Sequence, residues 1–269
     1  MSTTLRFTVF TKPWPGLTLD ELGEMVARMG FQGVELPVRP GYQVEPDHAL
    51  TQLPKAAETL KKHGVDLVSV AGPCNESMVR ACGEAGHPLL RIMVKVPTDT
   101  DYLAHLENTQ RGWDALLPTL ESSGVTLGVQ NHKQRFLTHA MHLYHAVARY
   151  DRKQIGAVWD AAHEAFAGSD PELALDVVWS HLCLVNLKNG RWEPDGKSDL
   201  GVAKWRPRWV AGHEGLCDWP RVARELSRRG YTGDVCLTAE YSEPAPARIG
   251  EMVQQDLTLA RLCFSSGQV

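Results

Sequence analysis

The stretch TLGVQNHK, residues 126–133, begins as an apolar β-strand and ends in consecutive polar side chains. Alternate side chains of a strand point to opposite faces, so Leu127 and Val129 share one face while Gln130 and His132 share the other. Residues 137–150 follow with helical periodicity, which makes a strand–helix unit. A buried strand that closes on an amide and an imidazole indicates side chains placed for a chemical task.

The strand–helix unit recurs along the whole chain of 269 residues, often with a glycine at the joint. Strands are predicted at 5–10, 33–38, 65–72, 89–96, 126–132, 155–160, 181–189 and 234–241, and helices at 17–31, 53–64, 75–86, 101–124, 137–150, 171–180, 219–230 and 247–264. Eight units of about 34 residues predict a single (β/α)8 TIM barrel over residues 1–269. A doubly wound open sheet is the alternative. It is disfavoured because no glycine-rich phosphate turn follows the first strand, and for the same reason no nucleotide cofactor is expected.

Two local features modify this pattern. Pro118 lies inside the longest predicted helix and is expected to kink or split it. Thr18, with Glu21 three residues later, is expected to cap the first helix. Residues 190–215 fit no unit and are expected to form an elaborated loop over one face of the barrel.

Charge and composition disfavour several classes of partner. The net charge of −4 and the sequence pI near 6.3 give no reason to expect nucleic acid or an anionic membrane. No apolar run of about 18 residues is present, and MSTTLRFTVF (1–10) lacks the features of a signal peptide, so a cytoplasmic location is expected. The six cysteines are scattered without a CxxC pair, which favours reduced thiols.

One face of each barrel strand packs against helices and should be apolar, while the other faces the barrel axis. Apolar pairs such as Leu127 and Val129 therefore direct the opposite parity inward. The inward set late in the strands comprises Glu35, Arg39, Arg91, Lys95, Gln130, His132, Asp160, Asn186, Lys188 and Glu240. Such convergence at the carboxyl ends of the strands predicts an active site, where TIM barrels hold their chemistry. For any single charge, a structural ion pair is the alternative.

Five segments resemble the xylose-isomerase-like TIM barrels, the sugar phosphate isomerase/epimerase superfamily. They are GFQGVEL (30–36), QNH (130–132), WDAAH (159–163), VNLKN (185–189) and GYTGDVCLTAEY (230–241). The resemblance covers essentially the whole chain in the right order. It implies a divalent metal held by Glu, Asp, His and Glu, at positions that fall here on Gln130, Asp160, Asn186 and Glu240. It also implies a substrate or metal contact at His163.

Gln130 and Asn186 depart from the family pattern, in which an ENH and an HxKD motif supply a carboxylate and an imidazole. Amide oxygens ligate Mg²⁺ or Mn²⁺ but contribute no charge and are poor partners for zinc. A metal held by Asp160, Glu240, Gln130 and Asn186 would therefore be Mn²⁺ or Mg²⁺, weakly bound. Asn189 also stands where the family often has an aspartate.

The resemblance implies two carboxylate bases, but a glutamine at 130 takes no proton at neutral pH. Glu240 is then the expected base. His132 shares the inward parity of Gln130 and titrates near neutrality, so it is the candidate second acid or base; a structural histidine is the alternative.

Several further residues are expected to bind the substrate. Cationic groups would neutralise a carboxylate, phosphate or enediolate oxygen, unless they only balance the nearby carboxylates. Including polar and aromatic groups, the expected substrate-binding set is Trp14, Glu35, Arg39, Arg91, Lys95, Gln130, His163 and Lys188. The Trp-rich stretch 204–209 would form an aromatic lid, loop packing or a subunit contact.

The expected function is that of a sugar or sugar-acid isomerase or epimerase that abstracts a proton next to a carbonyl. A lyase or dehydratase on an oxidised (keto) sugar needs one base and one acid, and the missing carboxylate at 130 modestly favours it. A third hypothesis is a sugar-binding barrel without activity. DNA repair resembling endonuclease IV is disfavoured, because its extra histidines are not evident and the chain is acidic. By analogy with relatives, a homo-oligomer is the expected assembly.

Overall fold

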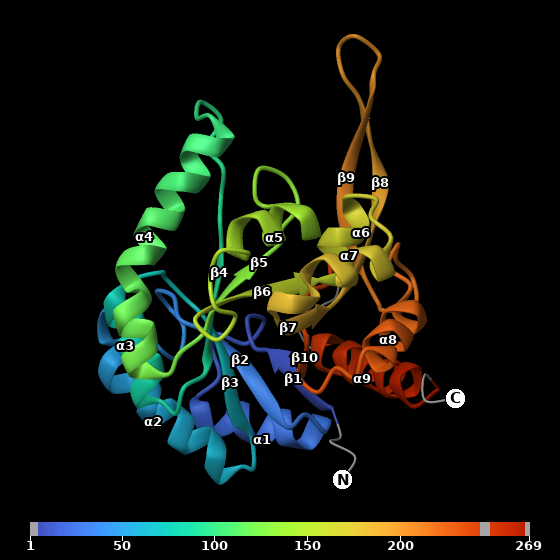
Figure 1. Cartoon of the computed structure of the whole chain (residues 1–269). Coiled ribbons are helices and arrows are strands. Elements are labelled where there is room, and N and C mark those ends of the chain that lie inside the picture. Colours follow the sequence, from blue (N-terminus) through green and yellow to red (C-terminus); the bar gives the residue numbers. More distant parts are fainter. Residues whose placement is uncertain (1–4, 243–247, 267–269) are drawn as a thin grey trace.

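The computed structural model describes residues 5–242 and 248–266. Its barrel strands are β1 (Arg6–Phe10), β2 (Gly33–Pro37), β3 (Asp66–Ala71), β4 (Leu89–Met93), β5 (Leu127–Gln130), β6 (Ile155–Asp160), β7 (Leu182–Leu187) and β10 (Asp234–Leu237). They pair in parallel and close in the order β1-β10-β7-β6-β5-β4-β3-β2 (Figure 1). The predicted (β/α)8 barrel is confirmed.

Helices cover the outside of the barrel (Figure 1). They are α1 (Leu19–Met29), α2 (Ala49–Lys62), α3 (Glu76–Glu84), α4 (Tyr102–Ser123), α5 (Ala140–Val147), α6 (Ala161–Phe166), α7 (Pro171–Val178), α8 (Trp219–Arg228) and α9 (Ile249–Ser266), with short 3₁₀ turns at Pro46–His48 and Trp179–His181. Thr18 and Glu21 form the predicted capping box of α1. α4 runs through Pro118 as one helix, so it does not split. No helix in the described part of the chain is long and apolar enough to span a membrane.

The structure has one helix that was not predicted, and the bounds of several others differ from the predicted ones. α6 was not predicted, because it is a short helix that starts directly after β6. The predicted last helix begins at residue 247, which lies outside the described residues, whereas α9 begins at Ile249.

The core has two parts that follow the alternation of side chains along the strands. Outward residues such as Leu127, Val129 and Val185 belong to the large cluster between barrel and helices. A smaller cluster of inward residues, Phe10, Ala71, Val158, Leu184 and Cys236, fills the barrel interior. The polar residues that come later in the same strands therefore lie between this apolar cluster and the carboxyl-end mouth of the barrel.

Residues 189–210 form an antiparallel hairpin, β8 (Asn189–Lys197) and β9 (Ala203–Val210), that projects away from the barrel (Figure 1). The expectation of an elaborated loop at 190–215 is wrong for this part. These two strands were not predicted, because they are rich in charged residues and each contains a proline, Pro194 or Pro207. A proline within a strand is typical of edge strands.

Asn189 fixes the base of this hairpin. Its amide nitrogen donates to the carbonyls of Gly212 and Cys217 over 2.7 and 2.8 Å. Its Oδ1 accepts from the N–H groups of Gly190 and Cys217 over 3.0 and 2.9 Å. Gly215 passes so close that a Cβ there would collide with the Asn189 amide. The asparagine therefore holds the segment after the hairpin against the barrel.

Candidate active site

A chain of polar contacts crosses the barrel interior from β2 to β6. Arg91 Nη2 lies 2.6 Å from Glu35 Oε1, and Arg91 Nε donates to Glu35 Oε2 over 2.8 Å. Arg91 Nη1 donates to Gln130 Oε1, and Gln130 Nε2 donates to Asp160 Oδ2 over 2.9 Å. All four side chains are buried. Because a guanidinium has only donors, Arg91 fixes the Gln130 amide with its NH2 group toward Asp160.

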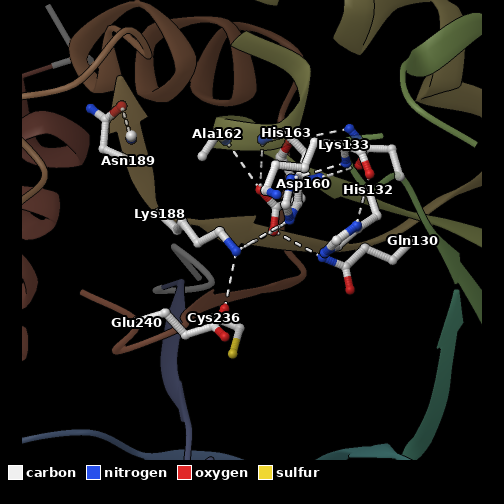
Figure 2. A network of polar contacts seen from close by, with 12 residues as sticks. Gln130, His132, Lys133, Asp160, Ala162, His163, Lys188, Asn189, Cys236 and Glu240 are labelled. Atoms are coloured by element: carbon white, nitrogen blue, oxygen red, sulfur yellow. Dashed lines mark hydrogen bonds and ion pairs between the residues drawn. The ribbon is translucent and has the colours of Figure 1, made fainter. Parts of the chain in front are cut away.

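Lys188, which directly follows β7, lies where side chains from β6, α6 and the segment after β10 converge (Figure 2). Its Nζ is 3.0 Å from Glu240 Oε2, 3.2 Å from His163 Nε2 and 4.0 Å from Asp160 Oδ2. Lys12 contacts the other oxygen of Glu240. Lys188 and Lys12 thus both contact the carboxylate of Glu240, whose side chain is partly exposed, at 22%.

These contacts set the charge of the two carboxyl groups. Burial by itself raises the pKa of Glu240, but Lys188 and Lys12 outweigh it and lower that pKa to about 2. Burial raises the pKa of Asp160 although Lys188 opposes it. Asp160 Oδ1 accepts from the N–H groups of Ala162 and His163, both over 3.1 Å, and so begins α6. N–H donors to both oxygens of Asp160 favour its ionised form and so oppose the effect of burial.

His132 and His163 pack against each other with their ring centroids 4.1 Å apart and their planes tilted by 44°. His132 Nδ1 donates to the Lys133 carbonyl over 3.1 Å, and His163 Nδ1 accepts from the Lys133 N–H over 3.2 Å. Burial, with Lys188 next, lowers the pKa of His132 to about 4 and that of His163 well below 6.5. The structure therefore favours a neutral His132 over the expected titration near neutrality, because this imidazole is packed beside a second one and near cationic lysines.

We expect the His132 imidazole to stay neutral as the pH falls from 6.5 toward about 4. The unfolded chain binds that proton near pH 6.5, so over this range the unfolded state carries more protons and His132 lowers the stability of the fold as the pH falls. A ¹H–¹⁵N NMR titration of the imidazole groups, with the signal assigned through His132→Gln, measures this midpoint. A midpoint at pH 6 or above would contradict the prediction.

Arg39 lies on the β2–β4 side of the mouth. Its guanidinium is 6.0 Å from the centroid of the Phe10 ring, which Arg91 also covers at 4.9 Å. Arg39 and Arg91 line a pocket of about 440 Å³ that also includes Asn75 and Met93. The position suits an anionic group of a substrate, while Arg91 itself is already paired with a buried carboxylate.

Two predicted site residues lie apart from the charged cluster. β4 ends at Met93, so alternation no longer directs Lys95, which is exposed and joins Phe136 through a backbone bridge. Its side chain makes no hydrogen bond or ion pair within residues 5–242 and 248–266, so its predicted place in the inward set is wrong. Trp14 is half-buried and packs against the hydrophobic core. No hydrogen bond or ring contact links its side chain to the charged cluster in the described part of the chain.

Lys12 and Trp209 are site residues that the sequence did not predict. Lys12 follows β1 at the parity of Phe10, so the alternation that found Arg91 would have found it too. Trp209 comes from β9, and its ring centroid is 3.9 Å from Lys188 Nζ and 5.2 Å from the His163 ring. The lid interpretation of residues 204–209 therefore gains support at Trp209, which no barrel periodicity could have placed.

Asn186 and Thr238, at or directly after the ends of β7 and β10, are buried polar residues whose side chains have no hydrogen-bond partner in the described part of the chain. Asn186 is 1% exposed, and neither Oδ1 nor Nδ2 forms a hydrogen bond within the described residues. Thr238 Oγ1 is also buried and unpartnered there. Asn186 precedes Lys188 by two positions, and Thr238 precedes Glu240 by two positions. Because a buried unpaired polar atom costs about 1–3 kcal/mol, these atoms suit hydroxyl groups of a bound molecule.

The four positions at which the resemblance implies metal ligands do not offer free oxygens. Gln130 Oε1 accepts from Arg91, and both Asp160 oxygens accept from N–H groups. Each oxygen of Glu240 faces a lysine. Only the neutral Oδ1 of Asn186 is unoccupied among them. A divalent cation needs several anionic or carbonyl oxygens, so this donor set does not fit the metal.

Closed parallel strands, with charged groups buried at their carboxyl ends, define a TIM barrel with a polar mouth. A family model of the xylose isomerase-like TIM barrel matches residues 24–256, and the chain belongs to that family.

Three solved structures illustrate the similarity. The D-psicose 3-epimerase of Clostridium cellulolyticum H10, with D-tagatose, is 14% identical with a TM-score of 0.73, covering 97% of this chain and 99% of that one. The 3-keto-D-glucoside 4-epimerase YcjR of E. coli is 13% identical with a TM-score of 0.71, covering 97% and 100%. The probable 3-DHS dehydratase AsbF of Bacillus anthracis is 11% identical with a TM-score of 0.70, covering 94% and 99%. At these identities the likeness establishes the fold. No curated protein matches the chain in sequence.

Proposed function

We propose that this protein is an enzyme that moves a proton at the carbon next to the carbonyl of a small sugar or sugar acid, as an isomerase or epimerase does. The carrying observation is the Lys188–Glu240 pair, an ammonium group 3.0 Å from a carboxylate at the mouth of the barrel. Two of the structurally similar proteins are sugar epimerases by name, which supports a sugar substrate.

In the proposed step the carbonyl oxygen of the substrate accepts a hydrogen bond from Lys188. Glu240 takes the proton from the adjacent carbon, and the electron pair of the C–H bond forms a carbon–carbon double bond. The carbonyl π electrons move onto oxygen, whose negative charge Lys188 stabilises. In an epimerisation the bound enolate turns its other face to Glu240, which returns the proton to the same carbon while the carbonyl re-forms. In an isomerisation Lys188 passes a proton to the former carbonyl oxygen and takes one from the hydroxyl of the adjacent carbon, which becomes the new carbonyl, and Glu240 returns its proton to the former carbonyl carbon.

The contact between Lys188 and Glu240 also affects the basicity of Glu240. Lys188 is a principal cause of the low pKa of Glu240. When the substrate oxygen draws the hydrogen bond of Lys188 away, the pKa of Glu240 rises and the carboxylate becomes a stronger base. Substrate binding and proton abstraction are thereby coupled through one 3.0 Å contact.

The surrounding residues have supporting roles in this proposal. Asn186 offers an unpartnered amide to a substrate hydroxyl or carbonyl, and Trp209 offers an aromatic face beside Lys188. Arg39 would bind a carboxylate or phosphate of the substrate. Gln130 orients Asp160 and takes no proton itself. No step runs through a metal, because the donor set does not fit one.

A lyase or dehydratase is the second candidate, and the state of Gln130 favours it. Its amide is locked between Arg91 and Asp160, so no second carboxylate base lies opposite Glu240 at this position. In a dehydration Glu240 takes the proton next to the carbonyl, and the β-hydroxyl leaves as water after it receives a proton from an ammonium group such as that of Lys188. The similar AsbF structure, a probable dehydratase by name, is consistent with this reaction.

Incubation in D2O with a panel of ketoses, keto-sugars and sugar acids, followed by NMR, tests the proposal. We expect deuterium at the carbon next to the carbonyl together with an epimer or isomer. A dehydrated product would identify the lyase instead, and binding without any exchange or product would indicate a sugar-binding barrel and overturn the enzymatic proposal. Exchange that survives Glu240→Gln would contradict the role of Glu240 as the base.

A further inference from the structure

The buried charges at the mouth are balanced by the chain itself. Glu35, Asp160 and Glu240 bring three carboxylates, and Lys12, Arg91 and Lys188 bring three cations in contact with them. Adding a divalent cation would leave two uncompensated positive charges in a poorly solvated place, which is costly. The neutral histidines beside Lys188 add no negative charge.

Lys188 also occupies the space that a metal would need. A hard divalent cation binds carboxylate oxygens at about 2.0–2.6 Å, and Nζ of Lys188 already stands 3.0 Å from Glu240 Oε2 and 4.0 Å from Asp160 Oδ2. A cation between these two carboxylates would therefore meet an ammonium group at close range.

We propose that the Lys188 ammonium group is the resident cation of this mouth, and that the amides Gln130 and Asn186 make the site independent of divalent metal. Gln130 replaces a negative charge by a group that donates to Asp160, and Asn186 presents an amide where the resemblance implies an imidazole. Both changes lower the affinity for a metal and leave the lysine as the positive centre. The proposal that no divalent cation binds here does not depend on which reaction the site catalyses.

Isothermal titration with MnCl2 alone, on protein first treated with EDTA and dialysed, tests this directly and needs no substrate. We expect no saturable site in the wild-type protein and no rise of its Tm at 1 mM MnCl2. The double variant Gln130→Glu/Asn186→His restores the implied ligand set and is expected to bind one Mn²⁺ per chain. Its Tm should then rise by several degrees, because a ligand that binds only the folded state stabilises it.

Two further variants test the position of the gained site and the role of Lys188. Adding Asp160→Asn to the double variant should abolish the gained site, which places it at the mouth. Adding Lys188→Gln should instead tighten Mn²⁺ binding by about tenfold, because the competing cation is gone; unchanged affinity would overturn the role of Lys188. Circular dichroism confirms that each variant is folded.

Stoichiometric Mn²⁺ binding by the wild-type protein would overturn the proposal outright. A folded double variant that binds no Mn²⁺ would overturn the inference that Gln130 and Asn186 are the reason why the site binds no metal. Neither result would bear on whether Glu240 abstracts a proton, which the exchange experiment measures separately.

Discussion

Lys188→Met is expected to lower kcat by about 10²- to 10³-fold, the loss found when one donor to a developing oxyanion is removed. Methionine keeps an unbranched chain of similar length and removes the positive charge 3.0 Å from Glu240. KM should change much less than kcat, because the hydrogen bond strengthens as the oxygen becomes an anion. Steady-state kinetics on the substrate found in the exchange panel measures both constants.

The pH profile of Lys188→Met separates a catalytic lysine from a structural one. In the wild-type protein the pKa of Glu240 is about 2, so Glu240 stays ionised down to strongly acidic pH. Without Lys188, burial opposes only Lys12, the pKa of Glu240 rises, and activity should be lost at a higher pH on the acid side. Lys62→Met, which changes an exposed lysine of α2, is the matched control and should leave kcat unchanged. A folded Lys188→Met enzyme with kcat within threefold of wild type would contradict the account.

Arg91→Met is expected to lower the free energy of unfolding by about 3–5 kcal/mol, as the loss of one partner from a buried ion pair does. Glu35 is fully buried, and without Arg91 its carboxylate keeps, among residues 5–242 and 248–266, only the hydroxyl of Ser69, at 3.0 Å, as a hydrogen-bond donor. Gln130 Oε1 would lose its donor in the same variant. Urea unfolding followed by circular dichroism measures the change.

The double variant Arg91→Met/Glu35→Met provides the internal comparison. It removes both charges, so it should recover a large part of the lost stability, because no unpaired charge then remains buried. Arg80→Met breaks an exposed pair with Glu76 on α3 and should change stability by about 0.5 kcal/mol or less. If the double variant lost as much free energy of unfolding as the two single variants together, a buried unpaired charge would not be the cause of the instability.

Side-chain alternation predicted much of the site, because a closed barrel allows an apolar outer face and leaves the other parity for polar groups. Glu35, Arg91, Gln130, Asp160 and Lys188 are buried and in contact as this pattern implies. The pattern failed where the strand ended. Lys95 follows the end of β4, and no ladder fixed the direction of its side chain.

Other features of the site depend on tertiary contacts that no local pattern contains. The low pKa of His132 follows from burial, with His163 of α6 packed against it, and from Lys188, which follows β7. Trp209 reaches Lys188 through a hairpin whose charged strands resemble a loop in sequence. The single-domain extent, the cytoplasmic location and a homo-oligomeric assembly stay predictions.

Solvent-deuterium incorporation by EDTA-treated protein is the most direct test of proton transfer by Glu240 beside Lys188. We expect the treated wild-type enzyme to place deuterium at the carbon next to the carbonyl as fast as the untreated enzyme does. We expect Glu240→Gln to abolish this incorporation. Incorporation that disappears with EDTA and returns with Mn²⁺, or that persists in Glu240→Gln, would contradict these expectations.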